Sequence, residues 1–386
     1  MQLDSGHEYE AFDEEKMELV RKNFKGFEEP LLRLNPGGWV LPNEYPKFAN
    51  KIYNFEFRNT DVVVMTFPKC GTTWAQEIIW TMRNSPNLDH PWASKPPLTR
   101  SPFMDYDMLM GKTPEPGSSA YPIYEMFLEM CPGKNPDDGV NVQLAEAIPD
   151  PRTLKSHLPF SLMPPSMLDT AKVVYVARNP KDVIVSYHHF YKLMEDTEFI
   201  GQLEDFLDLF VNDDMIYGPY WLHLREAWER RDHPNIHIIF FEGVKENVMG
   251  ELEKLNDFLG TNLTEEQLRG IAEYTSFQNM RQRGNESRER NRPKVQAETE
   301  VSEEQKRKLE YVKKEGGFFR KGVVGDWKNR LTPEMSAKVD RWIRANLSDL
   351  GLNFRYGIGL LRQRKSTAYE FVAFVLFLLS FKNVYN

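Results

Sequence analysis

With 386 residues, 41% of them apolar and 27% charged, the chain has the composition of an ordinary folded protein, which excludes a disordered one. Its formal net charge of -8 argues against attraction to nucleic acid or an anionic membrane through the overall field, so that any anion site must be local. Two cysteines, Cys70 and Cys131, are too few for a disulfide framework, and the acidic N-terminus lacks an apolar signal, so we expect a cytoplasmic protein.

Three strand, loop and helix units follow one another along the chain. Each begins with an apolar run typical of a buried parallel strand and continues into residues with helical spacing. Alternating strands and helices predict an α/β fold, with a parallel sheet covered by helices on both faces. The predicted strands are residues 61–67, 172–177 and 236–241, and the predicted helices are residues 72–83, a segment that begins near Pro180, and residues 245–259.

Two segments lack this pattern. Residues 85–149 are rich in proline, glycine and aromatic residues and poor in periodicity, so we expect lids and pocket walls there. Near the C-terminus, residues 368–381 (AYEFVAFVLFLLSF) follow the basic residues Arg362, Arg364 and Lys365. This apolar segment is shorter than the roughly 20 residues of a membrane span. Contact with a membrane surface and a docked or poorly ordered tail both remain open.

The loop at residues 67–74, FPKCGTTW, lies between a predicted strand and a predicted helix. Free backbone N–H groups and the positive end of the helix dipole meet there, which suits a phosphate. Gly71 allows close approach of an anion, Thr72 and Thr73 offer hydroxyl groups, and Lys69 adds a charge. The order differs from GxxxxGK[ST], which disfavours an ordinary P-loop ATPase or GTPase. A tight turn with a helix cap is the alternative.

Two further segments have a similar character. In RNPKDVIVSYHHF, Arg178 stands at a strand end and Ser186 two helical turns later, although a solvated arginine and an ordinary helix serine would give the same sequence. In FFRKGVVGDWKN, Arg320 and Lys321 precede Gly322, which suits a phosphate grip or an exposed turn. Both segments are therefore candidates for anion binding.

Together, TFPKCGTTW, YVARNPKDVIVSYHHFY and RKGVVGDWKN resemble the stretches of cytosolic sulfotransferases that bind 3'-phosphoadenosine 5'-phosphosulfate (PAPS). The resemblance runs from about residue 55 to about residue 355 and suggests an invertebrate-type member. It implies a single α/β domain around a five-stranded parallel sheet, with a P-loop-like phosphosulfate-binding loop. We accordingly expect an N-terminal extension at 1–54, the sulfotransferase domain at 55–358 and a C-terminal tail at 359–386.

By matching position, the resemblance implies a complete PAPS site. Cys70 replaces the serine common in the family, and Phe241 stands where many relatives have tyrosine, so two hydroxyl groups are absent. The implied contacts are Lys69, Cys70, Gly71, Thr72 and Thr73 for the phosphosulfate, Arg178, Ser186, Arg320, Lys321 and Gly322 for the 3'-phosphate, and Trp74, Thr275 and Phe277 for the adenine.

The segment TLKSHLP supplies the candidate catalytic residues. Lys155 and His157 are two residues apart in a short predicted strand, so both side chains lie on one face. A histidine suits a general base because its pKa is near neutrality. The resemblance implies this role for His157, with Lys155 beside the sulfuryl group and Lys69 stabilising the leaving phosphate oxygen. We interpret His188 and His189 as helix-face residues, and the scheme needs no metal.

An apolar pocket would take the acceptor. Its candidate residues are Phe67, Phe103, Phe127, Phe160 and Phe190, each of which could instead be core. The expected acceptors are small alcohols, phenols, sterols or amines, which would give a sulfate ester and PAP, the 3',5'-bisphosphate that PAPS leaves. The alternatives are a PAPS-dependent dehydratase of an apolar alcohol and a non-catalytic nucleotide-binding relative.

Two questions about partners arise from charged segments. Arg281, Arg283, Arg288, Arg290, Arg292 and Lys294 form a basic run, but Glu286 and Glu289 interrupt it, so we expect a solvated loop and no nucleic acid. The family's dimer motif is KxxxTVxxxE. Here Lys328 and Thr332 are followed by Pro333 and Ala337, which leaves a homodimer open.

Overall fold

The structure is a computed structural model, which describes residues 2–110, 114, 118, 120–194, 196–290 and 303–347. All of them belong to one compact unit, residues 1–352. The predicted apolar segment at 368–381 lies outside the described residues. Within the described part of the chain, no helix is both long enough and apolar enough to span a bilayer.

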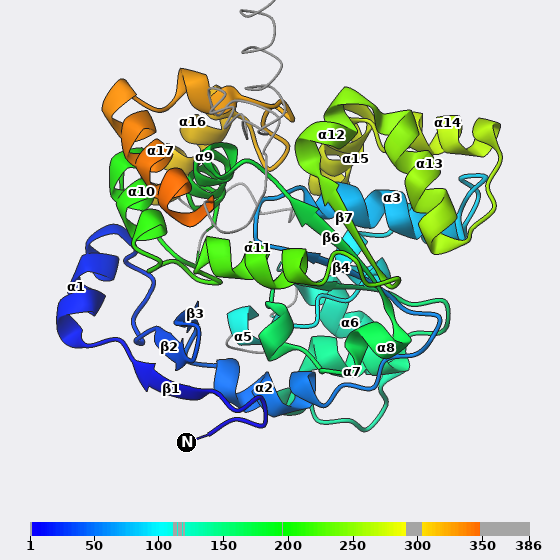
Figure 1. The fold of residues 1–386 in the computed structure, drawn as a ribbon, viewed down its shortest axis with the longest axis horizontal. Coiled ribbons are helices and arrows are strands. Elements are labelled where there is room, and N and C mark those ends of the chain that lie inside the picture. The colour runs from blue at the N-terminus through cyan, green and yellow to red at the C-terminus, as the bar shows by residue number, and fades with distance from the viewer. Residues whose placement is uncertain are drawn as a thin grey trace, which may run out of the picture. The chain divides into compact units, whose positions relative to one another are not determined.

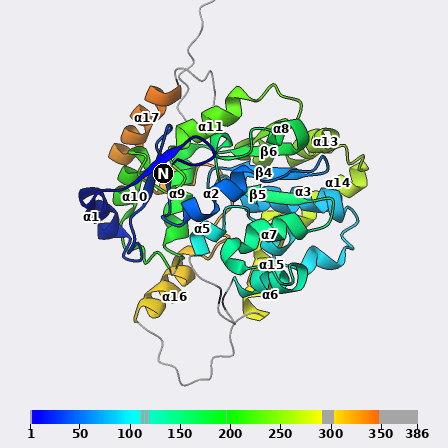
Figure 2. The ribbon, with the colours of Figure 1, turned by 90° about the horizontal axis from the view of Figure 1, so that it is seen from below.

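Among the described residues, the central sheet has four parallel strands in the order β5-β4-β6-β7. Figure 1 labels β4, β6 and β7, and Figure 2 labels β5, β4 and β6. Val64 of β4 pairs with Lys155 of β5 on one side and with Val174 of β6 on the other. The three strands predicted from the sequence are confirmed. The apolar runs of β4 and β6 lie in the buried centre of the sheet, whereas that of β7 lies at the end of the strand order and is partly buried. The strands are β4 (Val62–Thr66), β5 (Thr153–Ser156), β6 (Lys172–Ala177) and β7 (Ile236–Phe240).

The prediction of five strands is wrong for the described residues. At the free edge of β5, a single parallel bridge joins Phe103 to Lys155. The Lys155 N–H donates to the Pro102 carbonyl and the Met104 N–H donates to the Lys155 carbonyl, each over 2.9 Å. The chain then turns, because the Tyr106 N–H donates back to the Phe103 carbonyl. This turn ends the pairing after one bridge.

Helices cover both faces of the sheet, as the sequence predicted. On one face, Val62, Val64, Val174, Val176 and Ile239 form a core with apolar side chains of α3, α12, α13 and α14. On the other face, the Tyr175 hydroxyl lies 2.8 Å from Nδ1 of His223 in α11. These helices are α3 (Thr72–Asn84), α9 (Pro180–Tyr191), α10 (Leu203–Val211), α11 (Tyr220–Glu229), α12 (Phe241–Glu246), α13 (Val248–Leu259) and α14 (Glu265–Tyr274).

The helix expected at 245–259 is in fact divided at Asn247. The side chain of Asn247 accepts a hydrogen bond from the Gly250 N–H and so caps α13, while α12 begins at the very end of β7. A helix N-cap with its own side-chain acceptor starts a new helix, which is why the apolar periodicity alone did not show the break.

Residues 85–149, expected to be lids and pocket walls, contain short helices. Two of these helices, α6 and α7, pack together through a cluster of apolar side chains that includes Ile123, Phe127 and Leu144. The helices have 10 and 8 residues, too few turns for a clear period. The elements are η1 (Pro91–Ser94), α4 (Pro97–Arg100), α5 (Asp107–Met110), α6 (Tyr121–Met130), η2 (Pro136–Asp138) and α7 (Val140–Ala147).

The N-terminal residues form a small antiparallel sheet of β1, β2 and β3, near α2 in the view of Figure 2. Val40 of β3 is joined to the loop after α10, since the Tyr217 N–H donates to the Val40 carbonyl over 2.7 Å and the Val40 N–H donates to the Gly218 carbonyl over 3.0 Å. The elements are β1 (Glu8–Ala11), α1 (Glu14–Asn23), β2 (Leu32–Asn35), β3 (Trp39–Leu41) and α2 (Tyr45–Tyr53).

The remaining described elements complete the unit. They are η3 (Phe160–Leu162), α8 (Met167–Thr170), α15 (Phe277–Arg290), α16 (Glu303–Glu315), η4 (Asp326–Asn329) and α17 (Pro333–Leu347). The 3₁₀ turn η4 contacts α9, and α17 contacts α10.

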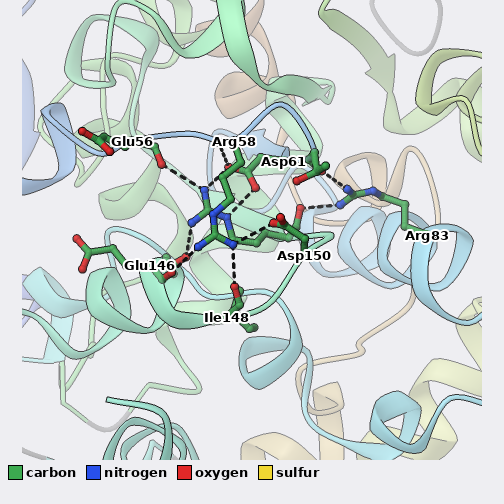
Figure 3. A network of polar contacts seen from close by, with 10 residues as sticks. Glu56, Arg58, Asp61, Arg83, Glu146, Ile148 and Asp150 are labelled. Atoms are coloured by element: carbon green, nitrogen blue, oxygen red, sulfur yellow. Dashed lines mark hydrogen bonds and ion pairs between the residues drawn. The ribbon is translucent and has the colours of Figure 1, made fainter. Parts of the chain in front are cut away.

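A network of arginines and aspartates joins the amino ends of β4 and β5 (Figure 3). Nε of Arg152 donates to Oδ1 of Asp61 over 2.7 Å, and both side chains are buried. At the more exposed side of the network, Arg58 donates to Asp150 over 2.9 Å. This network ties together the amino ends of these two strands. In open parallel sheets ligands bind at the opposite, carboxyl ends of the strands, which is where a functional site is expected.

Candidate functional site

The loop predicted to bind an anion lies at the carboxyl end of β4. Lys69 has a φ of 68° and Gly71 a φ of 106°, both in the left-handed region. A Cβ atom at Gly71 would lie 2.7 Å from Cδ2 of Phe241, so only glycine fits this turn. α3 begins at Thr72, directly after the turn, and its first N–H groups point toward the loop.

Three cations gather around this loop. Nζ of Lys69 lies 4.2 Å from the ring centroid of Phe190 and 4.5 Å from that of Phe318. Nζ of Lys155 lies 3.6 Å from the ring centroid of Phe103. Among the described residues no ion pair involves Lys69 or Lys155. Desolvation lowers the pKa of Lys69 to about 7, helped by the charges of Lys155 and Arg178, and lowers that of Lys155 to about 8.

Arg178 is the third cation. It donates to the Lys69 carbonyl over 2.9 Å, and its guanidinium lies 4.4 Å from the ring centroid of Phe241. Its Nε is buried without a hydrogen-bond partner in the described part of the chain. A buried donor on a guanidinium without an acceptor costs free energy unless a ligand supplies one. The arrangement therefore suits a multiply charged anion.

His157 stands at the end of β5 with its imidazole fixed on one side. Its Nδ1 lies 2.7 Å from the Thr66 carbonyl oxygen and 3.1 Å from the Thr66 hydroxyl, which in turn lies 2.7 Å from the Thr72 hydroxyl. A carbonyl only accepts, so Nδ1 carries the proton and Nε2 keeps its lone pair. Desolvation, with the charge of Lys155, holds the pKa of His157 well below its usual value, so the ring is a neutral base at pH 7.

A buried carboxylate that the sequence did not reveal lies behind His157. Asp105 is wholly inaccessible and accepts hydrogen bonds from the Ser156 hydroxyl over 2.8 Å, the His157 N–H over 3.1 Å and the Tyr217 hydroxyl over 2.7 Å. Burial raises the pKa of Asp105 to about 6. Nothing in the irregular segment around residue 105 distinguishes it, because its partners are distant in the chain.

Two of the three predicted adenine contacts, Trp74 and Phe277, lie beside Lys245. Trp74 lies 5.6 Å from Phe241 between ring centroids, and Nζ of Lys245 lies 4.4 Å from the Trp74 ring and 5.8 Å from the Phe277 ring. Nε1 of Trp74 is buried with no partner among the described residues. The Thr275 hydroxyl is buried and donates to the Ile271 carbonyl over 2.8 Å.

The third motif lies beside this aromatic group, because a Cβ atom at Gly322 would overlap the Phe277 ring. Arg320 and Lys321 each reach Asp326 at 2.7 Å. Asp182 of α9 ties the same loop down by accepting from the Gly325 N–H over 2.7 Å and from the Trp327 N–H over 3.2 Å. Ser186 lies farther along α9 and is partly exposed. A cavity of about 520 Å3 is lined by Arg281, Gly284, Asn285 and residues 312–321.

The five candidate pocket phenylalanines are divided. Phe103 lies 5.0 Å edge-on from the His157 ring, and Phe190 lies against Lys69. Phe67 is buried among aromatic side chains, 5.1 Å from Tyr220 between centroids. Phe127 lies in the α6 and α7 cluster, and Phe160 lies 5.0 Å from the Arg230 guanidinium. Only Phe103 and Phe190 have contacts with Lys69, Lys155 or His157 among those described here.

His189 is more than the helix-face residue that was predicted. Its Nδ1 lies 2.8 Å from the Tyr311 hydroxyl and its Nε2 lies 3.1 Å from the Gly317 carbonyl oxygen. It therefore joins α9 to α16 and to the segment before Arg320. His188 packs against Phe199 and Phe206, as a helix-face residue does.

The basic run predicted from the sequence begins in α15. Arg283 of α15 donates to the Tyr274 carbonyl over 2.7 Å, and the side chains of Arg288, Arg290, Arg292 and Lys294 lie outside the described residues. A search of the described residues finds no group of three or more His, Cys, Asp or Glu side chains that could hold a metal ion.

Comparison with known sequences gives one family. A family profile described as a sulfotransferase domain matches residues 59–351. Sulfotransferase 1A1 of Mus musculus is 33% identical over 320 residues, which cover 82% of this chain and 95% of the mouse protein. Luciferin sulfotransferase of Photinus pyralis is 28% identical, over 79% of this chain and 76% of the firefly protein.

Comparison with solved structures agrees. The crystal structure of retinol dehydratase with retinol and PAP is 29% identical and has a TM-score of 0.72, covering 90% of this chain and 98% of that one. The structure of retinol dehydratase with androsterone and the inactive cofactor PAP has a TM-score of 0.73 at 28% identity. The fold described above, with its parallel sheet between helices, is shared with these structures.

Proposed function

The chain belongs to the sulfotransferase family and is a PAPS-dependent enzyme that transfers a sulfuryl group to a small acceptor, and we propose that the residues around Lys69 and His157 perform this transfer. One observation carries the proposal. A histidine whose Nε2 keeps its lone pair lies in the same site as lysines that have no ion pair among the described residues. Such a site needs an anion to balance its charge, and PAPS is one.

The donor would bind along the path of the three motifs. Lys69, Cys70, Gly71, Thr72 and Thr73 would hold the phosphosulfate in a P-loop-like way, through backbone N–H groups of the loop and the start of α3. Trp74, Thr275 and Phe277 would surround the adenine. Arg178, Ser186, Arg320, Lys321 and Gly322 would hold the 3'-phosphate. The Nε of Arg178, which is buried without a partner among the described residues, supports this assignment.

The chemistry follows from this placement. Nε2 of His157 takes the proton of the acceptor hydroxyl as the acceptor oxygen forms its bond to sulfur, and the bond between sulfur and the phosphate oxygen breaks to release PAP. The ammonium of Lys69 stabilises the leaving phosphate oxygen, and that of Lys155 the oxygens of the transferring group. General-base catalysis contributes roughly 10² to 10⁴ in rate. In this scheme no metal takes part.

The acceptor would be a small and largely apolar alcohol, phenol, sterol or amine. The aromatic side chains beside His157 and Lys69 support an apolar pocket, and a structural relative binds retinol and androsterone. We retain the domain division at residues 54 and 358 and a cytoplasmic location as parts of the proposal.

The test is a screen of purified protein with PAPS and a panel of such acceptors, with PAP release and the sulfated product measured separately. Transfer to at least one acceptor is expected. If PAP binds but no acceptor yields product, the chain is a non-catalytic nucleotide-binding relative. If neither PAP nor PAPS binds, the assignment of the site is wrong.

Retinol dehydratase among the structural relatives favours a second candidate, a PAPS-dependent dehydratase. In that reaction the sulfate ester of an apolar alcohol loses sulfate and a proton to give an alkene. Sulfur-labelled PAPS separates the two outcomes. A sulfotransferase leaves the label on the organic product, whereas a dehydratase releases it as free sulfate together with the alkene.

A further inference from the structure

Asp105 connects three parts of the molecule at the back of the candidate site. Its Oδ1 accepts from the Ser156 hydroxyl and from the His157 N–H, and its Oδ2 accepts from the Tyr217 hydroxyl. Lys155 precedes Ser156 on β5, and the negative charge of Asp105 acts on its ammonium group. A wholly buried carboxylate is costly unless its oxygens are satisfied, and here three donors satisfy them.

We propose that Asp105 is a positioning residue of the sulfuryl transfer: it fixes the backbone that carries His157 and holds a negative charge beside Lys155. The proposal rests on the function proposed above. Asp105 does not itself touch the reacting atoms in this scheme.

The positional part follows from how His157 is held. Asp105 binds its N–H, Nε2 of His223 lies 3.0 Å from its carbonyl oxygen, and Thr66 binds its ring. With all three contacts present, Nε2 of His157 has one direction in which to face. A base displaced by about 1 Å can lose on the order of 100-fold in rate, so a residue that fixes its backbone affects turnover.

The N-terminal sheet contributes through Tyr217. This residue has a φ of 70°, which is unfavourable for a side chain of its size. Two backbone hydrogen bonds with Val40, one from the Tyr217 N–H and one to the Gly218 carbonyl, hold the loop there. The Tyr217 ring then lies 5.4 Å from His157, and its hydroxyl reaches Asp105. Backbone strain of this kind persists where surrounding contacts enforce it.

The electrostatic part concerns Lys155. The groups that face Asp105 are Lys155 and His157 of the β5 end, Tyr217 after α10 and Tyr45 of α2. The charge of Asp105 raises the pKa of Lys155 and so opposes the lowering by desolvation. With a pKa of about 6, Asp105 is charged at pH 7 and above. It therefore helps to keep Lys155 an ammonium in the pH range where turnover needs one.

The test compares Asp105→Asn, Asp105→Glu and wild type, with kcat, PAP affinity and the pH dependence of kcat as readouts. In Asp105→Asn we expect kcat to fall about 10- to 100-fold while PAP affinity stays within about twofold. The alkaline fall of kcat should move to lower pH, because Lys155 loses the charge that favours its protonated form. Asp105→Glu keeps the charge and should restore the position of that alkaline fall.

Asp107→Asn is the matched control. Asp107 is also a buried carboxylate, and it accepts from Asn141 and Val142 at the start of α7, away from His157. It should lose stability without a change in the pH dependence of kcat. If Asp105→Asn keeps the wild-type kcat and pH dependence, or if Asp107→Asn shifts that dependence equally, the proposal is wrong.

A failure to fold would not end the test. Tyr217→Phe keeps the ring and removes only one donor from Asp105. Protonation of Asp105 at acid pH should lower kcat. Tyr217→Phe should lower kcat and move this acid fall to higher pH, because the lost donor favours the charged carboxylate. An unchanged profile in Tyr217→Phe would overturn the proposal. If wild type itself transfers no sulfuryl group, the proposed function fails instead, which distinguishes the two.

Discussion

Thr66 and His157, 91 residues apart, are joined by a 2.7 Å hydrogen bond from Nδ1 of the imidazole to the Thr66 carbonyl. Thr66 ends β4 and His157 follows β5, so the pairing of the two strands brings them together. The bond decides the tautomer of the ring. It leaves Nε2 as the basic nitrogen, which can take a proton from the acceptor.

Replacing His157 by alanine should abolish measurable turnover, since the loss of a general base lowers the rate by roughly 10² to 10⁴. The affinity for PAP should stay nearly unchanged. The reason is that a general base acts on the acceptor and not on the donor. Steady-state rates and calorimetric PAP titration measure the two effects. Thr66→Val is a suitable control, since it keeps the carbonyl that orients Nδ1 and should keep most activity. Near-normal turnover in His157→Ala would mean that another group is the base.

Lys69→Met and Arg178→Ala should each weaken PAP binding by about 1.5 to 3 kcal/mol, which is the usual worth of a charge-assisted hydrogen bond. Arg178 should also matter for the loop itself, because it binds the Lys69 carbonyl. Calorimetry gives the affinities. Arg231→Ala, in the exposed turn that follows α11, serves as the control and should bind PAP normally. Unchanged affinity in both site variants would contradict the donor-site assignment.

Both kcat/KM for PAPS and kcat should fall at alkaline pH. The pKa of Lys69 is lowered to about 7 and that of Lys155 to about 8, so both charges are present below these values and are lost as the pH rises through them. We expect kcat/KM for PAPS to decline from about pH 7 upward. The decline in kcat should come at higher pH, because bound phosphosulfate stabilises both ammonium groups. Initial rates across this range measure both, and a flat kcat/KM would exclude the two lysines as donor contacts.

Gly322→Ala should weaken PAP binding by displacing Phe277, whose ring occupies the space of the added methyl group. Gly325→Ala in the same loop is the matched control. Both glycines have a positive φ, 62° and 81°, but the nearest atom to a Cβ at Gly325 is 3.9 Å away. Both variants should therefore lose about 1 to 2 kcal/mol of stability from backbone strain, and only Gly322→Ala should lose PAP affinity. Equal loss of affinity in both would show that Phe277 is not a donor contact.

Arg152→Met should destabilise the fold by about 3 to 5 kcal/mol, because it removes the guanidinium that pairs with the buried Asp61 carboxylate. Denaturant unfolding measures this loss. Arg58→Met is the matched control, since its ion pair with Asp150 is largely exposed and is worth at most about 1 kcal/mol. A similar small loss in both variants would contradict the structural role of the Arg152 pair. PAP affinity should change in neither, because the network lies at the amino ends of the strands.

Local patterns in the sequence were enough for three of the strands and for the turn that opens α3. The run DVVVMTF predicted β4, and FPKCGTTW predicted a turn that opens a helix, because each depends on residues next to one another in the chain. The resemblance of three motifs to a family then implied the roles of Lys69, Arg178 and His157. The comparisons confirm the family, and the residue roles stay predictions.

Other features depended on contacts between distant residues. The resemblance implied five strands, but the described residues form four, and beside β5 the pairing stops after a single bridge at Phe103 because the chain turns at Tyr106. Phe127 and Phe103 look alike in the sequence, yet only Phe103 lies beside His157. Periodicity says that an aromatic side chain will be buried, but not which of several cores receives it.

By itself, then, the sequence determined the α/β class, the order of its units and the loop that suits an anion, since propensity, caps and apolar period act over a few residues. The tertiary structure alone decided which ring nitrogen of His157 carries the proton and which carboxylate lies behind the residue. Asp105 meets His157 across 52 residues and Tyr217 across 112. A hydrogen bond between such distant partners leaves no pattern in the chain near either of them, and only the folded backbone brings the donor and the acceptor together.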